Sequence, residues 1–414
     1  MTVSPYDVIV RHADPGGVLP GLGDVVSTAA SGRLVSSGNA FASSPPSGTA
    51  AQQAADAPAY FAGASLLHVE DGWAYLGRSF ASLLQGDHAA ALHLAYYAEL
   101  RGAIGLLAGH GILSGNWKGW ALDSHGKLIR RKLPHGTHGA TWELFERWSR
   151  RTDGFDMLSQ VLRPFDRPLE DWLDGARAVG IGGSPLATAQ HLLRRWSLDL
   201  KSFGADRDAR NLFSYQPSGI QPRVEFLPEP FVCEVWRDLD PQGADPFEQL
   251  DRYLLRDTLD IGMRSLAPAT RRITAVDSLL KHMDEPAGAR DLVTRSGAFA
   301  HDPAVIKFSR GPAVPWAVIA RATILLRVAT GSGRWLLSQA GVTREDLRAW
   351  GERIVRERQL DPSGGAADFV DLWLDVDESL AHMATLPALA GERTQAMLRR
   401  LEGCERVTAW SLAA

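Results

Sequence analysis

Residues 89–107, with the sequence AAALHLAYYAELRGAIGLL, decide the fold class of this chain. The stretch is rich in Ala and Leu, which are among the residues that form helices most readily. Its apolar side chains recur every three or four residues, which places them on one helix face, at Leu92, Tyr96, Leu100, Ala103 and Leu107. We therefore predict a long amphipathic helix, although Gly102 and Gly105 each weaken it.

The same spacing continues on both sides of this stretch. Upstream it runs through Trp73, Leu76 and Phe80, and downstream it returns in segments 141–151, 246–258, 275–283, 314–330, 343–358, 366–383 and 393–402. Alternation typical of strands is nearly absent. The exception is residues 114–134, which indicate a hairpin around the turn candidate at 123–126. The sequence predicts a mainly α protein with two helical subdomains and at most small β-hairpins.

Composition shifts divide the chain into three parts. Residues 27–58 are rich in Ala, Ser and Gly and show no sustained period, so we expect residues 1–59 to form a loop-rich N-terminal arm. Four prolines between Pro217 and Pro230 mark a boundary. We expect one helical domain over 60–217 and a C-terminal helical domain over 218–414.

Charge and cysteine content limit the kind of protein. Among 414 residues, 44 basic and 48 acidic side chains give a net charge of −4, so nucleic acid binding requires a local basic patch. Cys233 and Cys404 are too few for a disulfide framework. The most apolar stretch, 313–329, contains two arginines and is shorter than the roughly 20 residues of a membrane span. We expect a cytoplasmic protein without membrane association.

A pair of histidines raises the question of metal binding. His135 and His138 lie on a glycine-containing loop, and Glu143 follows on the next predicted helix. Zinc sites use three or four ligands, and this loop offers two. We predict no metal and no cofactor, with a metallohydrolase built on these histidines as the weaker alternative.

A short polar motif ends a predicted helix just before Pro217. It consists of Arg210, Asn211 and Tyr215 in the pattern R-N-x-x-x-Y. The pattern resembles R-N-x-x-x-H, the signature of the HEPN superfamily, whose members are compact helical bundles in toxins, CRISPR-associated nucleases and phage-defence proteins. In that family the Arg and His of two facing protomers form a metal-independent ribonuclease site. The helix through Tyr96 and Arg101 resembles the partner helix of such a bundle.

The resemblance implies a role for these residues and also a departure from it. Arg210, Asn211 and Tyr215 become the candidate catalytic residues, and a homodimer and an RNA partner become expectations. Tyr has an ordinary pKa near 10, so Tyr215 is a poor general base at neutral pH where the family has His. The departure favours binding over efficient cleavage. A structural alternative pairs Arg210 with Asp206, one turn earlier.

Two further groups could bind a ligand. His93, Tyr97 and Arg101 line one helix stripe, which is either a solvated face or part of a polar network with Arg210. Residues 286–335 are basic and include Arg310 and Arg321, which either bind phosphates or pair with the acids of 361–378.

These observations favour a HEPN-like protein that acts in a nucleic-acid, stress or phage-defence context. It would bind RNA or a protein partner through a degenerate ribonuclease motif. The alternative is a non-catalytic α-helical scaffold subunit of a multiprotein complex.

Overall fold

The computed structural model confirms a mainly α fold with one small sheet. It describes residues 3–30, 50–181, 188–215, 226, 228–239, 247–264, 266, 269–284, 286, 288–294, 303–343, 345–347 and 349–350. The described α-helices are α1 (Pro5–His12), α2 (Leu19–Ala30), α4 (Ala50–Leu84), α5 (His88–Gly109), α6 (Thr137–Trp148), α7 (Thr152–Val161), α8 (Leu169–Ala178), α9 (Ala189–Arg195), α10 (Leu200–Tyr215), α11 (Pro228–Asp238), α12 (Glu248–Arg264), α13 (Ala269–His282), α14 (Ala289–Thr294), α15 (Ala304–Ser309) and α16 (Pro315–Gln339).

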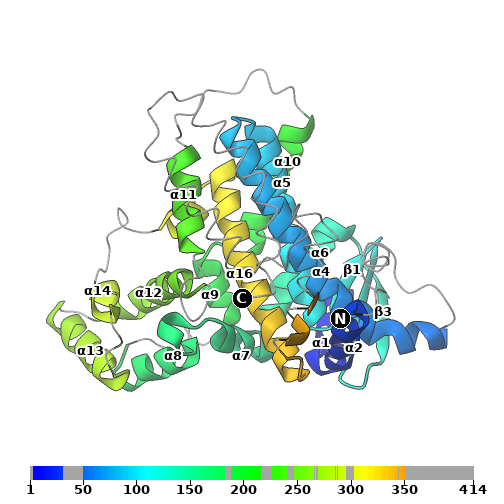
Figure 1. Cartoon of the computed structure of the whole chain (residues 1–414), viewed down its shortest axis with the longest axis horizontal. Helices are drawn as coiled ribbons and strands as arrows, with labels where there is room; N and C mark the ends of the chain where they lie inside the picture. Colours follow the sequence, from blue (N-terminus) through cyan, green and yellow to red (C-terminus); the bar gives the residue numbers. More distant parts are fainter. Residues whose placement is uncertain are drawn as a thin grey trace.

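Helices α4 and α16 pack along α5, which also contacts α10, α6 and the first strand of the small sheet (Figure 1). Asp87 caps the N-terminus of α5 by accepting a hydrogen bond from the Ala90 backbone N–H at 2.9 Å. At Gly105 a Cβ would lie 2.7 Å from Val69 Cγ2 and 2.9 Å from the Ser65 carbonyl oxygen. The absent side chain therefore lets α4 approach α5 closely, which explains why glycine occurs in a strong helix.

The hairpin expected at 114–134 is present, and a third strand extends it. Strands β1 (Ile112–Gly115), β2 (Lys118–Leu122) and β3 (Leu128–Lys132) form an antiparallel meander in that order. The Asp123 carboxylate accepts hydrogen bonds from the backbone N–H groups of His125 and Lys127, which closes the β2–β3 turn.

The loop-rich arm expected for residues 1–59 is wrong for 5–12, 19–30 and 50–59, which are helical. Tyr6, Ile9 and Val10 follow i, i+3, i+4 spacing in α1, and all three are buried where α1 meets α6 and the sheet. The Arg151 guanidinium holds α1 by donating to the carbonyl oxygens of Val10 and Ala13. Residues 31–49 lie outside the described part of the chain.

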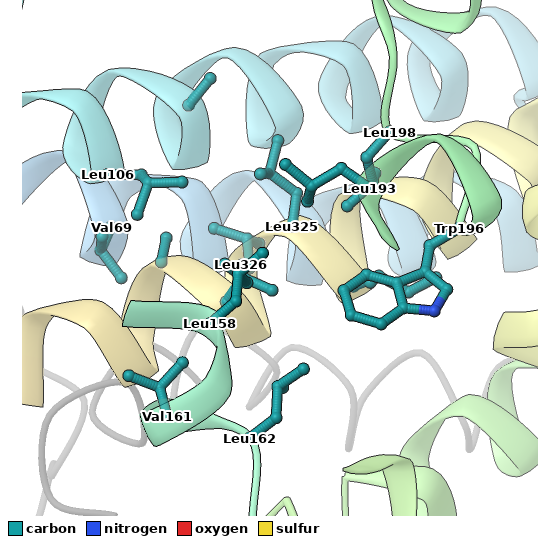
Figure 2. Close-up of a cluster of buried hydrophobic side chains, with 14 of the residues drawn as sticks. Val69, Leu106, Leu158, Val161, Leu162, Leu193, Trp196, Leu198, Leu325 and Leu326 are labelled. Carbon is teal, nitrogen blue, oxygen red and sulfur yellow. The ribbon is translucent and has the colours of Figure 1, made fainter. Parts of the chain in front are cut away.

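The boundary expected at residues 217–218 does not divide the hydrophobic core. Side chains from both sides of it form one buried cluster. Figure 2 shows Val69 and Leu106 from the first part beside Leu325 and Leu326 of α16. Because α16 packs on α4 and α5, the two helical parts share a core. Of the helices in the described ranges, none is both long and apolar enough to cross a membrane.

Candidate functional site

Helices α5 and α10 run antiparallel and bring the two groups of candidate residues together. His93 Nδ1 lies 3.0 Å from Ser214 Oγ, and the Arg210 guanidinium lies over the Tyr97 ring. Nearer the other end, Arg321 contacts both Glu99 and Asp206. As the residue number rises along α5, from 93 to 97 to 99, the number of the matching residue on α10 falls, from 214 to 210 to 206. The polar stripe of His93, Tyr97 and Arg101 does meet the Arg210 motif.

Arg210 is held by aromatic rings and has no acidic partner among the described residues. Its guanidinium carbon lies 5.2 Å from the Tyr96 ring centroid and 5.5 Å from that of Tyr97. Its one hydrogen bond to a described side chain is long, 3.5 Å from Nη2 to His138 Nδ1. Nε is buried and has no hydrogen-bonding partner within the described residues. Within the described part of the chain, the Arg210 guanidinium therefore has one long hydrogen bond and no ion pair.

The Nδ1 atom of His138 faces two side chains, the Tyr96 hydroxyl and the Arg210 guanidinium. The Tyr96 hydroxyl lies 3.0 Å from Nδ1, and the Trp142 indole N–H donates to that hydroxyl at 3.4 Å. Burial, followed by the charge of Arg210, lowers the pKa of His138 and favours the neutral ring. Arg210 can only donate, so Nδ1 is the acceptor and the ring proton resides on Nε2.

A second Arg–His pair has the same arrangement across α4 and α5. The Arg101 guanidinium donates to His68 Nδ1 at 2.7 Å, and its distance to the Asp71 carboxylate is 4.0 Å. Burial, followed by the charge of Arg101, lowers the pKa of His68 to about 3. This imidazole is therefore also neutral and carries its proton on Nε2.

Both histidines line a cavity of ≈ 380 Å³ between α4, α5, the sheet and the start of α6. Its walls combine aromatic, basic, polar and aliphatic groups, namely Tyr60, Ala64, His68, Tyr97, Leu100, Arg101, Ile104, Leu113, Ser114, Gly115, Asn116, Trp120, Thr137 and His138. No Asp or Glu of the described segments is among them. Arg210 contacts two of these residues, Tyr97 and His138. The cavity is suited to a ligand with both an anionic and an aromatic part.

A buried ionic cluster fixes α10 beneath this site. Arg321 donates from Nε and Nη2 to the Asp206 carboxylate at 2.8 and 2.5 Å, and from Nη1 to the carbonyl oxygens of Ser309 and Gly311 at 2.6 and 3.1 Å. Glu99 lies 3.7 Å from Arg321 Nε. Burial, followed by the charge of Asp206, raises the pKa of Glu99 well above its ordinary value.

This cluster corrects two sequence expectations. Asp206 pairs with Arg321, so the alternative pairing of Asp206 with Arg210 is wrong. Arg321 is only 2% exposed and its donors are engaged, so it cannot contact a phosphate. Arg310 likewise pairs with Asp257, which also accepts hydrogen bonds from Arg195 at 3.1 Å. The acids of 361–378 lie outside the described residues.

The structure gives less detail for Asn211 and Tyr215, the other two residues of the motif. Asn211 is half-buried on α10, one residue after Arg210. Tyr215 is the last residue of α10, and its side chain lies outside what the structure describes.

The two loop histidines do not converge on one point. His135 Nδ1 lies 2.9 Å from the Tyr6 hydroxyl, whereas His138 faces Tyr96 and Arg210. Glu143 pairs with Arg147 instead of approaching either imidazole. Within the described ranges, no three His, Cys, Asp or Glu side chains are placed to share a metal ion.

The sequence did not single out His68 or Trp120 as part of a site. His68 belongs to an apolar helical run, and only its pairing with Arg101 on another helix reveals its role. Trp120 lies in the predicted hairpin of residues 114–134, and the basic residues of that hairpin are the sequence signal that points to it. No protein-family model, curated protein or solved structure matches the chain.

Proposed function

We propose that this chain binds single-stranded RNA at the cavity between His68 and His138, in a nucleic-acid, stress or phage-defence context. The observation that carries the proposal is the pair of Arg–His contacts, Arg101 with His68 and Arg210 with His138. Arg101 and both histidines line the cavity, Arg210 contacts its lining residues Tyr97 and His138, and no Asp or Glu of the described segments is among the lining residues. Such groups complement the phosphate of a nucleotide.

The aromatic walls favour a nucleotide over a simple anion. Tyr60, Tyr97 and Trp120 line the same cavity as the two histidines. A base stacked on an aromatic side chain contributes about 1–3 kcal/mol, and single strands leave their bases free to stack. The volume of ≈ 380 Å³ lies within the range of small-ligand pockets.

The tautomers of the two histidines favour binding over cleavage. A general base needs a free lone pair, but both Nδ1 atoms already accept hydrogen bonds and both neutral rings carry their proton on Nε2. Burial raises the pKa of Tyr60 and Tyr96 to about 12, so neither phenol removes a proton at neutral pH. Neutral histidines and protonated phenols support a degenerate HEPN-like motif that binds RNA without cleaving it efficiently.

The test measures RNA affinity and RNA integrity together, by fluorescence anisotropy and gel electrophoresis without added metal. Arg210→Ala should weaken RNA binding about tenfold to a hundredfold, the effect of losing hydrogen bonds from a charged donor. The melting temperature should hardly change, because Arg210 forms no ion pair with a described residue. Arg177→Ala on α8, which removes an exposed pair with Asp174, is the matched control.

Two results would contradict the proposal. Unchanged RNA affinity in Arg210→Ala would separate the motif from binding. A wild-type chain that binds no RNA but copurifies in a stable protein complex would favour the scaffold alternative. The HEPN resemblance also predicts that Tyr215→His, which restores the family's base, gains metal-independent cleavage while the wild type leaves RNA intact.

A further inference from the structure

The β1–β2 turn contains a tryptophan in an unfavourable conformation. Asn116 and Trp117 both have positive φ, 48° and 62°, and Gly115 pairs with Lys118 to close the two-residue turn. This turn geometry favours Asn-Gly, because a bulky residue is strained in the left-handed region. The Trp117 side chain is nonetheless 55% exposed. Burial therefore does not offset the strain, and a large aromatic surface is presented to solvent.

The adjoining strands carry like charges opposite each other. In the β2–β3 register, Lys118 lies across from Lys132 and Trp120 across from Arg130. Cross-strand partners share a sheet face, so these four side chains lie on the face from which Trp120 enters the cavity. Two lysines directly opposite each other destabilise a sheet. Lys118, Arg130 and Lys132 form no ion pair with any described residue.

The strained turn, and the strand pair whose cations form no ion pair with a described residue, lie next to the cavity. Asn116 lines the cavity, and the Trp117 ring lies within 3.9 Å of the position of a Cβ on Gly136, just before Thr137 and His138. Residues 117–132 hold five basic side chains and one acidic side chain, Asp123, in a chain whose net charge is −4. Asp123 is occupied by the turn it closes.

We propose that this basic ribbon, defined by Trp117, Lys118, Trp120, Arg130 and Lys132, guides an extended single strand of RNA into the cavity. Trp117 stacks on a base, and the three cations contact successive phosphates. The inference rests on the proposed function and extends it, because it makes the ligand a strand of several nucleotides instead of one nucleotide. Alternating aromatic and cationic groups is the pattern of single-strand recognition.

The experiment compares two probes on the full chain. A dinucleotide reports the cavity alone, and an RNA of about twelve nucleotides reports the cavity together with the ribbon. Wild type should bind the longer RNA at least roughly tenfold more tightly than the dinucleotide, because added phosphate contacts raise affinity. A DNA strand of the same sequence shows whether the 2′-hydroxyl contributes, and an RNA duplex tests the need for unstacked bases.

Two variants test whether the ribbon residues contact RNA or only stabilise the fold. Trp117→Gly should weaken binding of the longer RNA about fivefold to a hundredfold, the effect of losing one stacked base. It should leave the melting temperature unchanged or higher, because Gly relieves the strained turn. Lys118→Gln with Lys132→Gln should lower the slope of log affinity against log salt by about 1.4, or about 0.7 for each lost phosphate contact. Dinucleotide binding should be unaffected in both.

The outcomes distinguish this inference from the function on which it rests. Equal affinity of wild type and ribbon variants for the longer RNA, or equal affinity for duplex and single strand, would overturn the ribbon and leave the cavity intact. A melting temperature that falls together with binding in both variants would make the ribbon structural. Failure of wild type to bind either probe would overturn both proposals. Arg177→Gln, outside the ribbon, is the control for nonspecific charge loss.

Discussion

Replacement of Arg321 by Met should destabilise the protein more than most single substitutions. Arg321 is 2% exposed, and its guanidinium makes two hydrogen bonds to Asp206 and two to backbone carbonyl oxygens. Met fills a similar volume without any donor. Asp206 would remain fully buried, with the Glu99 carboxyl beside it as a hydrogen-bonding partner in place of a cation.

The size of the effect follows from what is left unpaired. Breaking a buried ion pair by removing one partner costs about 3–5 kcal/mol, chiefly from the stranded charge. Removing both charges is often close to neutral, so Arg321→Met combined with Asp206→Leu should be less destabilising than Arg321→Met alone. The free energy of unfolding from urea titrations measures both effects.

Arg177→Met is the matched control, because Arg177 is about half exposed and pairs with Asp174 on the surface. We expect a change within about 0.5 kcal/mol for this variant. A cost below about 1 kcal/mol for Arg321→Met would refute the reasoning. So would a double variant that is as unstable as the sum of its two single changes.

Three further predictions concern stability. Burial lowers the pKa of His68 to about 3 and of His110 to about 4, so the unfolded state binds more protons. Their stabilisation is complete above about pH 6.5 and is lost as pH falls toward these values, by up to about 1.4 kcal/mol per pH unit for each histidine in urea titrations. Glu99→Gln should stabilise the protein at pH 7.5 and have little effect at pH 4. The raised pKa of Glu99 means that, above its ordinary value, the folded state keeps a proton that the unfolded state loses, so wild-type stability falls as pH rises; equal effects of the substitution at both pH values would contradict this. Gly105→Ala should cost about 1–3 kcal/mol through overlap with α4. Gly204→Ala on α10, with open space around it, should stabilise by about 0.5–1 kcal/mol, and similar melting temperatures for the two glycine variants would argue against close packing of α4 and α5.

Features that depend on neighbouring residues in the sequence were predictable. Helix α5 followed from its periodic apolar residues, and the β2–β3 hairpin followed from its turn residues. Helix α1 was missed because eight residues give little periodic signal, and its stability depends on distant partners such as Arg151.

Long-range pairing accounts for what the sequence left undetermined. Asp206 has Arg210 one turn away, yet it pairs with Arg321, which is 115 residues distant in sequence. Burial decides between them, because a fully buried carboxylate requires a cation that is buried with it. Because Asp206 pairs with Arg321, Arg210 lies at the α5–α10 contact with no ion pair to a described residue. The position of Arg210 in the sequence motif alone does not reveal which arginine pairs with Asp206.

The two faces of α5 connect this packing to the proposed function. Gly102 and Gly105 face α16 and α4, where the lack of side chains allows close contact. Tyr97 and Arg101 line the cavity on the same helix. A binding site is precise when its side chains stand on an element that cannot shift, and the close α4–α5–α16 contact supplies that rigidity. The glycines that weaken α5 as an isolated helix therefore position the aromatic and cationic groups of the site.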